Sequence, residues 1–160
     1  MTLQEAVHTF KREHATTRKV LQALPADQAL FKPHERSNTA LMLGWTCVAE
    51  ERLIAKALSG QPVLGGGWPT PPATWQEVLD AFEASYEQVL DAAARAVDGS
   101  LAPVTFYVAP KQTGEYAALD FVMFMLFDQI HHRGQFSVYL RLAGGKVPSI
   151  YGPSADEPWT

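Results

Sequence analysis

A carboxylate and two adjacent imidazoles interrupt the most apolar stretch of this chain. The stretch runs from Thr113 to Gly145 and reads TGEYAALDFVMFMLFDQIHHRGQFSVYLRLAGG. Asp128 and His132 are four residues apart, so on a helix their side chains lie one turn apart on the same face. Unpaired polar groups on a buried helix face are costly. The two side chains therefore need each other, a metal ion or a ligand as a partner.

Three interpretations of this cluster remain open from the residues alone. Carboxylates and imidazoles both ligate divalent metal ions. An ionised aspartate also favours a protonated histidine, which would hold charge in a metal-free pocket that binds a small molecule. In a purely structural interpretation, His131, Arg133 and Gln135 hold the C-terminal tail or a partner subunit. Arg133 would then pair with Asp156 or Glu157 of the tail.

The stretch itself predicts a long helix over about residues 113–145. It contains no proline, and the run from Phe121 to Phe127 is apolar without interruption. Such a run is too apolar for a helix with one solvent-facing side, so we expect the central helix of an all-α domain, contacted on several sides. Met125 and Gln135 continue the face of the polar pair and are expected to line any pocket there.

Three further amphipathic helices are predicted from apolar residues spaced three and four apart. Two begin with capping boxes, formed by Thr2 with Glu5 and by Thr74 with Glu77. Ser37 or Asn38 is the expected cap of the remaining one. The three helices cover about residues 3–24, 38–58 and 75–97.

Other polar residues are candidates to complete a site. His14 stands in the inward stripe of the first helix, where a leucine is expected. It either bonds a neighbour in the core or reaches the pocket of His132. Glu50, Glu51 and Arg52 are most simply a solvated face of the second helix, and Glu50 is the one expected to reach a pocket edge.

The second helix has two candidate inward rows. The row expected to face the core holds Met42, Thr46, Ala49 and Leu53, and the adjacent row holds Leu43, Cys47, Glu50 and Ile54. Two long connections, 59–73 and 98–112, separate the helices. The second contains the apolar piece VTFYV, which is too isolated to predict a sheet.

Together these elements predict an all-α fold, a four-helix bundle with crossover loops and an extended C-terminal tail. Ile150, Tyr151 and Trp159 of the tail are available to pack back on the bundle. Such bundles build their sites from side chains on facing helices. A single domain over residues 1–160 accounts for this length.

The composition of the chain argues against nucleic-acid and membrane partners. The chain is 47% hydrophobic and 19% charged, with a net charge of −4 and no basic stripe, so we expect no nucleic-acid partner. No segment has the length and apolarity of a membrane span, and none has the pattern of a signal peptide. The single cysteine, Cys47, excludes an internal disulfide and predicts a cytoplasmic location.

The run DQIHHRGQFSVYLRLAGGKVPSIYGPSADE resembles the last helix and tail of the DinB-like (DinB/YfiT) superfamily. VLQALP followed by FKPHERSNTALMLGW is similar to that superfamily's first connection and second helix. The resemblance covers nearly the whole chain and implies an up-down-down-up four-helix bundle, commonly a homodimer. Many members bind a divalent metal through three histidines, one on the second helix and two that are four residues apart on the fourth. A few branches are thiol-dependent transferases.

The resemblance assigns ligand positions, and this chain departs from two of them. His132 matches the second of the paired fourth-helix histidines, whereas the first falls on Asp128, which can still ligate a divalent ion. The second-helix histidine falls on Thr46, after Trp45, and a neutral hydroxyl is a poor ligand for zinc or nickel. A third ligand must then come from another residue, for which the candidates are His14, Glu50, Cys47 and His131.

The resemblance therefore implies a divalent-metal-dependent enzyme of hydrolase or thiol-transferase type with a degenerate metal site. We expect one zinc or nickel ion per chain, with Asp128, His132 and His14 as ligands and with His131 or Glu50 as general base. Four further residues would line the pocket: Thr46, Cys47, Met125 and Gln135. The alternative is a metal-free dimeric bundle that binds a small molecule or acts as a structural protein, so whether the chain is an enzyme remains open.

Overall fold

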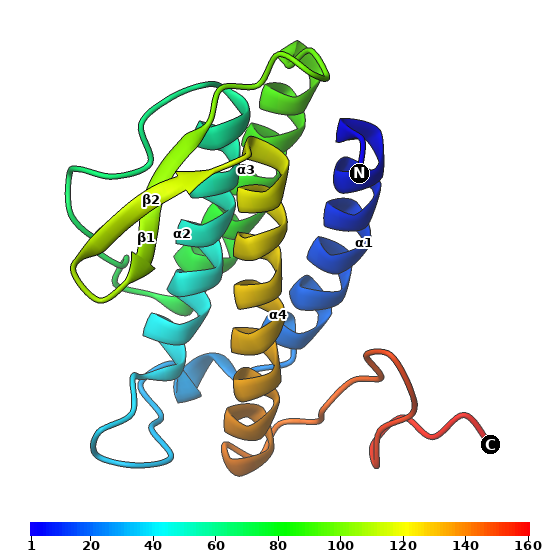
Figure 1. Cartoon of the computed structure of the whole chain (residues 1–160). Coiled ribbons are helices and arrows are strands. Elements are labelled where there is room, and N and C mark those ends of the chain that lie inside the picture. Colours follow the sequence, from blue (N-terminus) through cyan, green and yellow to red (C-terminus); the bar gives the residue numbers. More distant parts are fainter.

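Four long helices pack into a bundle in the computed structural model, which describes all 160 residues (Figure 1). They are α1 (Leu3–Gln22), α2 (Ala40–Leu58), α3 (Trp75–Arg95) and α4 (Ala118–Leu142), with a short 3-10 turn, η1 (Ala26–Gln28), between the first two. The loop after α2 runs back along the bundle, so α3 is parallel to α2 while α1 and α4 run the opposite way (Figure 1). The predicted helical bundle in up-down-down-up order is confirmed.

The helix starts follow their capping residues. Both predicted capping boxes are present, with Thr2 and Thr74 each accepting a backbone hydrogen bond from the glutamate three residues on. The prediction for α2 was wrong by one residue or more, because the N-cap is Thr39, whose hydroxyl accepts a hydrogen bond from the backbone N–H of Met42. Thr39 is the last extended residue before the helix, and so its side chain reaches the free N–H groups.

A β-hairpin stands where no sheet was predicted. β1 (Val104–Ala109) pairs antiparallel with β2 (Gln112–Tyr116), so the predicted helix over 113–145 begins only at residue 118. Two strands alone are marginal in water. This pair is supported by the bundle, because the ring of Phe106 packs edge-on against Phe121 and near Phe124 of α4.

The rotation of α2 also differs from the prediction. The buried row is Leu43, Cys47, Glu50 and Ile54, whereas Met42, Thr46 and Leu53 of the other row are only partly buried. Gly44 explains part of this rotation, because a Cβ atom there would lie 2.7 Å from the Trp75 ring of α3. With this rotation, the glutamates of α2 point into the interior. The solvated face predicted for Glu50 and Glu51 was wrong, since their exposed fractions are 2% and 0%.

One side of α4 stays exposed, contrary to the expectation of contacts on several sides. Phe124 and Phe127 are 39% and 60% exposed, because the hairpin covers only the start of the helix. The opposite side is buried and includes Gln129 and Arg133 among its apolar residues. None of the helices combines the length and the apolarity that crossing a membrane requires.

The C-terminal tail folds back on α1 and α4. Arg133 binds Glu13 of α1 at 2.9 Å and also contacts the Tyr151 hydroxyl of the tail, so the predicted pairing of Arg133 with Asp156 or Glu157 was wrong. Asp156 pairs instead with Arg141, which is eight residues, or about two turns, further along α4. Arg133 points into the bundle, where only α1 and Tyr151 reach it.

Candidate metal centre

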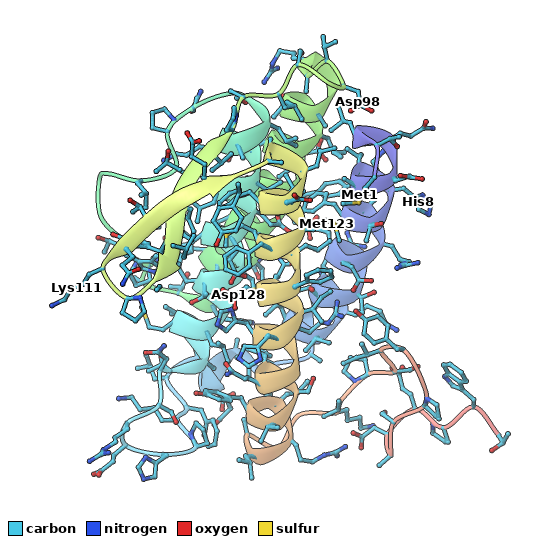
Figure 2. All side chains as sticks on the ribbon, viewed as in Figure 1. Met1, His8, Asp98, Lys111, Met123 and Asp128 are labelled. Carbon is cyan, nitrogen blue, oxygen red and sulfur yellow. The ribbon has the colours of Figure 1, made fainter.

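Glu50, Asp128 and His132 form a cluster between α2 and α4. One ligand atom from each residue lies within 4.8 Å of the others. Figure 2 shows Asp128 between α4 and α2, below the hairpin. The i, i+4 spacing on α4 supplies Asp128 and His132, as predicted, and the buried row of α2 supplies Glu50.

The cluster is closed on the side of α2 and open on the side of α4. Glu50 is buried, while the side chain of His132 is 20% exposed and Asp128 is half-buried. Nδ1 of His132 lies 2.8 Å from Oε1 of Glu50, within hydrogen-bond distance. The second carboxylate oxygen, Oε2, is buried and has no hydrogen-bond partner. A buried acceptor of this kind is rare in folded proteins, and its usual partner is an ordered water molecule or an ion.

Burial dominates the acid–base behaviour of Glu50. Desolvation of its carboxylate raises the pKa to about 7, against the opposing effect of the hydrogen bond with His132. The nearby charge of Asp128 adds to the rise. In turn, the hydrogen bond to Glu50 raises the pKa of His132 above its ordinary value. Near neutral pH, therefore, Glu50 and His132 both hold or share protons that a cation could displace.

The donor set suits a divalent cation. Two carboxylates and one imidazole are ligands that zinc accepts, and atoms ligating one zinc ion at about 2.1 Å stand roughly 3 to 4 Å apart. The ligand atoms of the three residues already lie within 4.8 Å of one another, close to such spacings. A cation here would also provide the partner that Oε2 of Glu50 lacks. The residues present thus fit the metal that the fold implies.

Thr46 and Cys47 lie next to this cluster on α2 but offer little as ligands. The Thr46 hydroxyl donates to the Met42 carbonyl oxygen one turn earlier. Cys47 is buried, its thiol faces the Leu43 carbonyl oxygen, and burial raises its pKa well above the ordinary value. A protonated thiol is not a metal ligand, because the thiolate is the species that binds.

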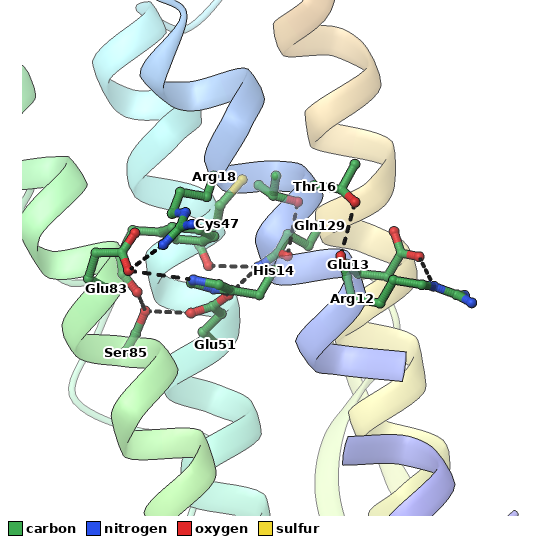
Figure 3. A network of polar contacts seen from close by, with 12 residues as sticks. Arg12, Glu13, His14, Thr16, Arg18, Cys47, Glu51, Glu83, Ser85 and Gln129 are labelled. Carbon is green, nitrogen blue, oxygen red and sulfur yellow. Dashed lines mark hydrogen bonds and ion pairs between the residues drawn. The ribbon is translucent and has the colours of Figure 1, made fainter. Parts of the chain in front are cut away.

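His14 belongs to a different polar network, shown in Figure 3. Its Nδ1 lies 2.8 Å from Oε1 of Glu51, and the other oxygen of Glu51 accepts a hydrogen bond from the Ser85 hydroxyl at 2.7 Å. The Gln129 amide donates both to Glu51 and to the Cys47 carbonyl oxygen. This network joins all four helices in the bundle interior.

Two aromatic rings hold His14 in this network. Its imidazole stacks on Phe82 and Tyr86 of α3, with ring centroids 4.4 and 4.2 Å away. Desolvation raises the pKa of Glu51, and the hydrogen bonds from His14 and Ser85 oppose that rise. The structure therefore does not bring His14 to Asp128 and His132, and Glu50 takes the third place in the cluster.

The remaining predicted site residues are distributed around α4. His131 and Gln135 are exposed and hydrogen-bond each other at 2.9 Å, with the His131 ring centroid 5.4 Å from that of His132. Met125 is buried in the apolar cluster under the hairpin. Of these three, His131 alone is placed beside a member of the metal cluster.

Sequence reasoning missed the buried roles of Glu51, Ser85 and Gln129. One sequence feature could have indicated that Glu51 is buried. The ten residues from Ala40 to Ala49 contain no charge, so the acidic pair that follows them lies on a largely apolar helix. No such signal marks Ser85 or Gln129, whose partners are 34 and 78 residues away from them along the chain.

Comparisons with known proteins agree with this architecture. The uncharacterized protein YrdA of Bacillus subtilis is 29% identical over 98% of this chain and 92% of its own length. A DinB-like protein from Bacillus cereus has a similar fold, with a TM-score of 0.77, 18% identity and coverage of 94% of this chain and 98% of its own. The DinB-like protein YjoA of Bacillus subtilis follows, with a TM-score of 0.67, 15% identity and coverage of 90% and 96%.

A sequence profile of the DinB family matches residues 1–159, almost the entire chain. The four-helix order and the polar pair on the fourth helix agree with the resemblance described above. The chain therefore belongs to the DinB family.

Proposed function

We propose that this protein binds one divalent metal ion per chain through Glu50, Asp128 and His132 and catalyses a hydrolytic or group-transfer reaction there. The observation that carries the proposal is the buried Oε2 atom of Glu50, which lacks a partner beside two further ligand groups. In this proposal Glu50 replaces His14 as the third ligand. Its position one turn after Thr46 compensates for the histidine that α2 lacks.

The donor set bears on which metal is bound. Carboxylates shift preference toward harder ions, whereas imidazole favours zinc, nickel and iron. Zinc accepts both ligand types, and its catalytic sites use three protein ligands and one water molecule. We therefore propose zinc as the ion bound, with nickel and manganese as the competitors to compare.

Each side chain has a distinct role in the proposal. A divalent ion with three protein ligands supplies a lowered pKa to bound water and polarises a substrate oxygen. The buried Glu50 loses its proton when it ligates, while Asp128 and His132 stay open to solvent on the α4 side. His131 is the proposed general base, because its ring is exposed and adjacent to His132.

The existing hydrogen bond between Glu50 and His132 favours a second candidate function. It gives both groups a partner without any ion. In that case the cluster is the polar end of a metal-free site for a small molecule, with Asp128 as its exposed acceptor. Metal titration separates the two candidates.

A homodimer is the partner that the exposed side of α4 supports. Four apolar residues of this helix are between 39% and 60% exposed: Phe124, Phe127, Val138 and Leu142. Apolar side chains gathered on one helix are typical of a subunit interface. Analytical ultracentrifugation of Phe127→Asp should show a shift from dimer to monomer, and an unchanged sedimentation coefficient would contradict this interface.

The metal proposal is tested by thermal unfolding of protein stripped with a chelator. Zinc at about 100 times its dissociation constant should stabilise the fold by about 2.7 kcal/mol, which raises Tm by roughly 5 to 10 °C for a chain of this size. Glu50→Gln keeps the shape of the side chain but removes its charge, and should abolish the shift. Glu87→Gln, an exposed position on α3, is the matched control and should keep it.

A zinc shift of equal size in Glu50→Gln would contradict the ligand assignment. No shift with zinc, nickel or manganese in the parent protein would contradict metal binding itself and leave the metal-free site.

A further inference from the structure

A cavity of about 700 Å³ lies between α2, the loop after it and the tip region of β1. It is separate from the four-helix interior and from the network of His14. Small-molecule sites usually measure about 300 to 1,000 Å³, so this cavity has room for a ligand of ordinary metabolite size. It is far larger than a water molecule or a simple inorganic ion requires.

The walls of the cavity are mainly apolar. Six side chains provide this surface: Leu53, Val63, Leu64, Trp68, Phe106 and Tyr107. Trp68 and Tyr107 are 53% and 52% exposed, although aromatic rings of this size are normally covered. Gly65, Gly66 and Gly67 form part of the rim, each with positive φ, and a Cβ atom on any of them would meet nothing within 4 Å.

The charged groups of the cavity all have one sign. Arg52 and Lys56 are one turn apart on α2, and the lining includes no carboxylate. Neither side chain forms an ion pair within the chain. The Arg52 guanidinium is held over the Trp45 ring, 4.8 Å from its centroid, so its orientation is restricted before any ligand arrives.

The surroundings of these two cations reinforce the positive charge. Arg52 and Lys56 also border a neighbouring polar cavity of about 400 Å³, to which Arg95 and Asp91 of α3 contribute. Three cationic groups and one carboxylate therefore line the two cavities together, with Arg52 and Lys56 at the junction between them. Because like charges gathered at a low-dielectric wall attract a counter-ion, an anionic group is the chemistry that this junction selects.

We infer that this cavity binds an organic anion with an apolar body. Its carboxylate or phosphate group would lie at Arg52 and Lys56, where a guanidinium can form two parallel hydrogen bonds. Its apolar part would lie against Trp68, Phe106 and Leu53. The volume of the cavity favours an amphipathic ligand, because an inorganic anion would leave most of the apolar wall uncovered.

The cavity and the proposed metal centre share helix α2. Ala49, the neighbour of Glu50, contributes to its lining, and Leu53 lies about one turn beyond Glu50 on α2. As the substrate pocket of the proposed enzyme, this site rests on the proposed function. Binding of the anion does not, so it is tested on metal-free protein, in which a failure of metal binding has no effect on the result.

The test compares two fluorescent probes that differ in one charge. 1-Anilinonaphthalene-8-sulfonate carries a sulfonate, and N-phenyl-1-naphthylamine has the same aromatic body without it. The sulfonate probe should saturate near one site per chain in the presence of a chelator. Arg52→Met combined with Lys56→Met should weaken it at least tenfold while changing the neutral probe by less than threefold.

Two controls locate the bound probe. Lys11→Met with Lys32→Met removes the same charge from exposed positions that do not line the cavity, and should leave both affinities unchanged. Leu53→Trp fills the cavity from α2 and should weaken both probes. Unfolding curves verify that each variant is folded before its affinity is compared.

Three results would overturn the inference. The first is a sulfonate-probe affinity that Arg52→Met with Lys56→Met does not change. The second is full binding of both probes to Leu53→Trp, which would place them elsewhere. The third is displacement of the sulfonate probe by inorganic phosphate as readily as by phenyl phosphate, which would show that no apolar body is recognised.

Discussion

Glu50 and Glu51 are neighbours in the sequence, yet they serve two separate polar sites. One helical step of about 100° directs Glu50 toward Asp128 and His132 of α4 and Glu51 toward His14 and Ser85. Burial raises the pKa of both carboxyl groups. The two carboxylates differ in their hydrogen bonds. Both oxygens of Glu51 have hydrogen-bond partners, whereas Oε2 of Glu50 has none.

Replacing Thr46 by histidine should tighten metal binding. Thr46 is one turn before Glu50 on α2 and only partly buried, so an imidazole there can reach the same cation as a fourth ligand. We expect zinc to bind at least tenfold more tightly, which is about 1.4 kcal/mol or more. Isothermal titration with a competing chelator measures this affinity.

Met42→His is the matched control for that variant. It adds the same imidazole one further turn away, where it cannot reach Glu50. Equal zinc affinities for Thr46→His and Met42→His would show that α2 is not arranged around the proposed ion.

The directions in which the two glutamates point could not be predicted from the sequence. The i, i+4 spacing was enough to place Asp128 and His132 together, because helix geometry is local. Whether Glu50 and His14 face the same pocket depends on the rotation of α2 and α1 against their neighbours. Gly44 and Trp75 influence that rotation by close packing, which the apolar period alone does not reveal.

At the scale of elements, α1, α4 and the tail are joined by one buried ion pair. The side chains of Arg133 and Glu13 are 2% and 3% exposed, and Tyr151 of the tail closes the pair by bonding both. Arg133 also donates to the Thr17 hydroxyl and to the Glu13 carbonyl oxygen. Arg133 therefore anchors the tail as the structural interpretation predicts, but it does so through Tyr151 and not through Asp156 or Glu157.

Arg133→Ala should destabilise the protein by about 3 to 5 kcal/mol, because it leaves Glu13 buried without its cation. Urea unfolding measures this change, and limited proteolysis should show earlier cleavage within residues 146–160. Arg141→Ala breaks a solvent-screened pair with Asp156 and should destabilise the protein far less. Similar losses in the two variants would contradict the burial argument.

Elements were predictable to the extent that their signals are local. Four helices, two capping boxes and the long crossover loops follow from periodicity, threonines and glycines near in sequence. The hairpin was missed because its stability comes from Phe106 resting on α4 and not from the strands themselves. The exposed side of α4 was missed because an apolar run does not reveal which of its residues lack a neighbour.

For the whole molecule, buried carboxyl groups couple stability to pH. The pKa of Glu50 is about 7 in the folded chain and near 4.5 in the unfolded chain, so between these values the folded state holds one more proton. Stability therefore falls as pH rises, by about 1.4 kcal/mol per pH unit for each such proton. The raised pKa values of Glu51 and His132 act in the same direction, and the His132 contribution is full below pH 6.5 and is lost as pH rises from there through its raised pKa.

Metal-free protein should therefore lose about 2 to 3 kcal/mol of stability between pH 5 and pH 7. Urea unfolding at a series of pH values measures the slope, and Glu50→Gln should make it shallower, because glutamine does not titrate while Glu51 and His132 still do. The zinc-induced rise in Tm should grow over the same range, since the ion displaces protons from Glu50 and His132. Stability of the metal-free protein that rises from pH 5 to pH 7 would contradict the raised pKa values.

Elemental analysis of tag-free protein shows whether Glu50, Asp128 and His132 hold a metal ion. The protein should be purified without a metal-affinity step or added metal and measured by mass spectrometry of its elements. We expect close to one equivalent of a divalent transition metal per chain, mainly zinc. Glu50→Gln should contain only a small fraction of that amount. A parent protein that contains no stoichiometric metal and takes up none from zinc or nickel solutions would contradict it.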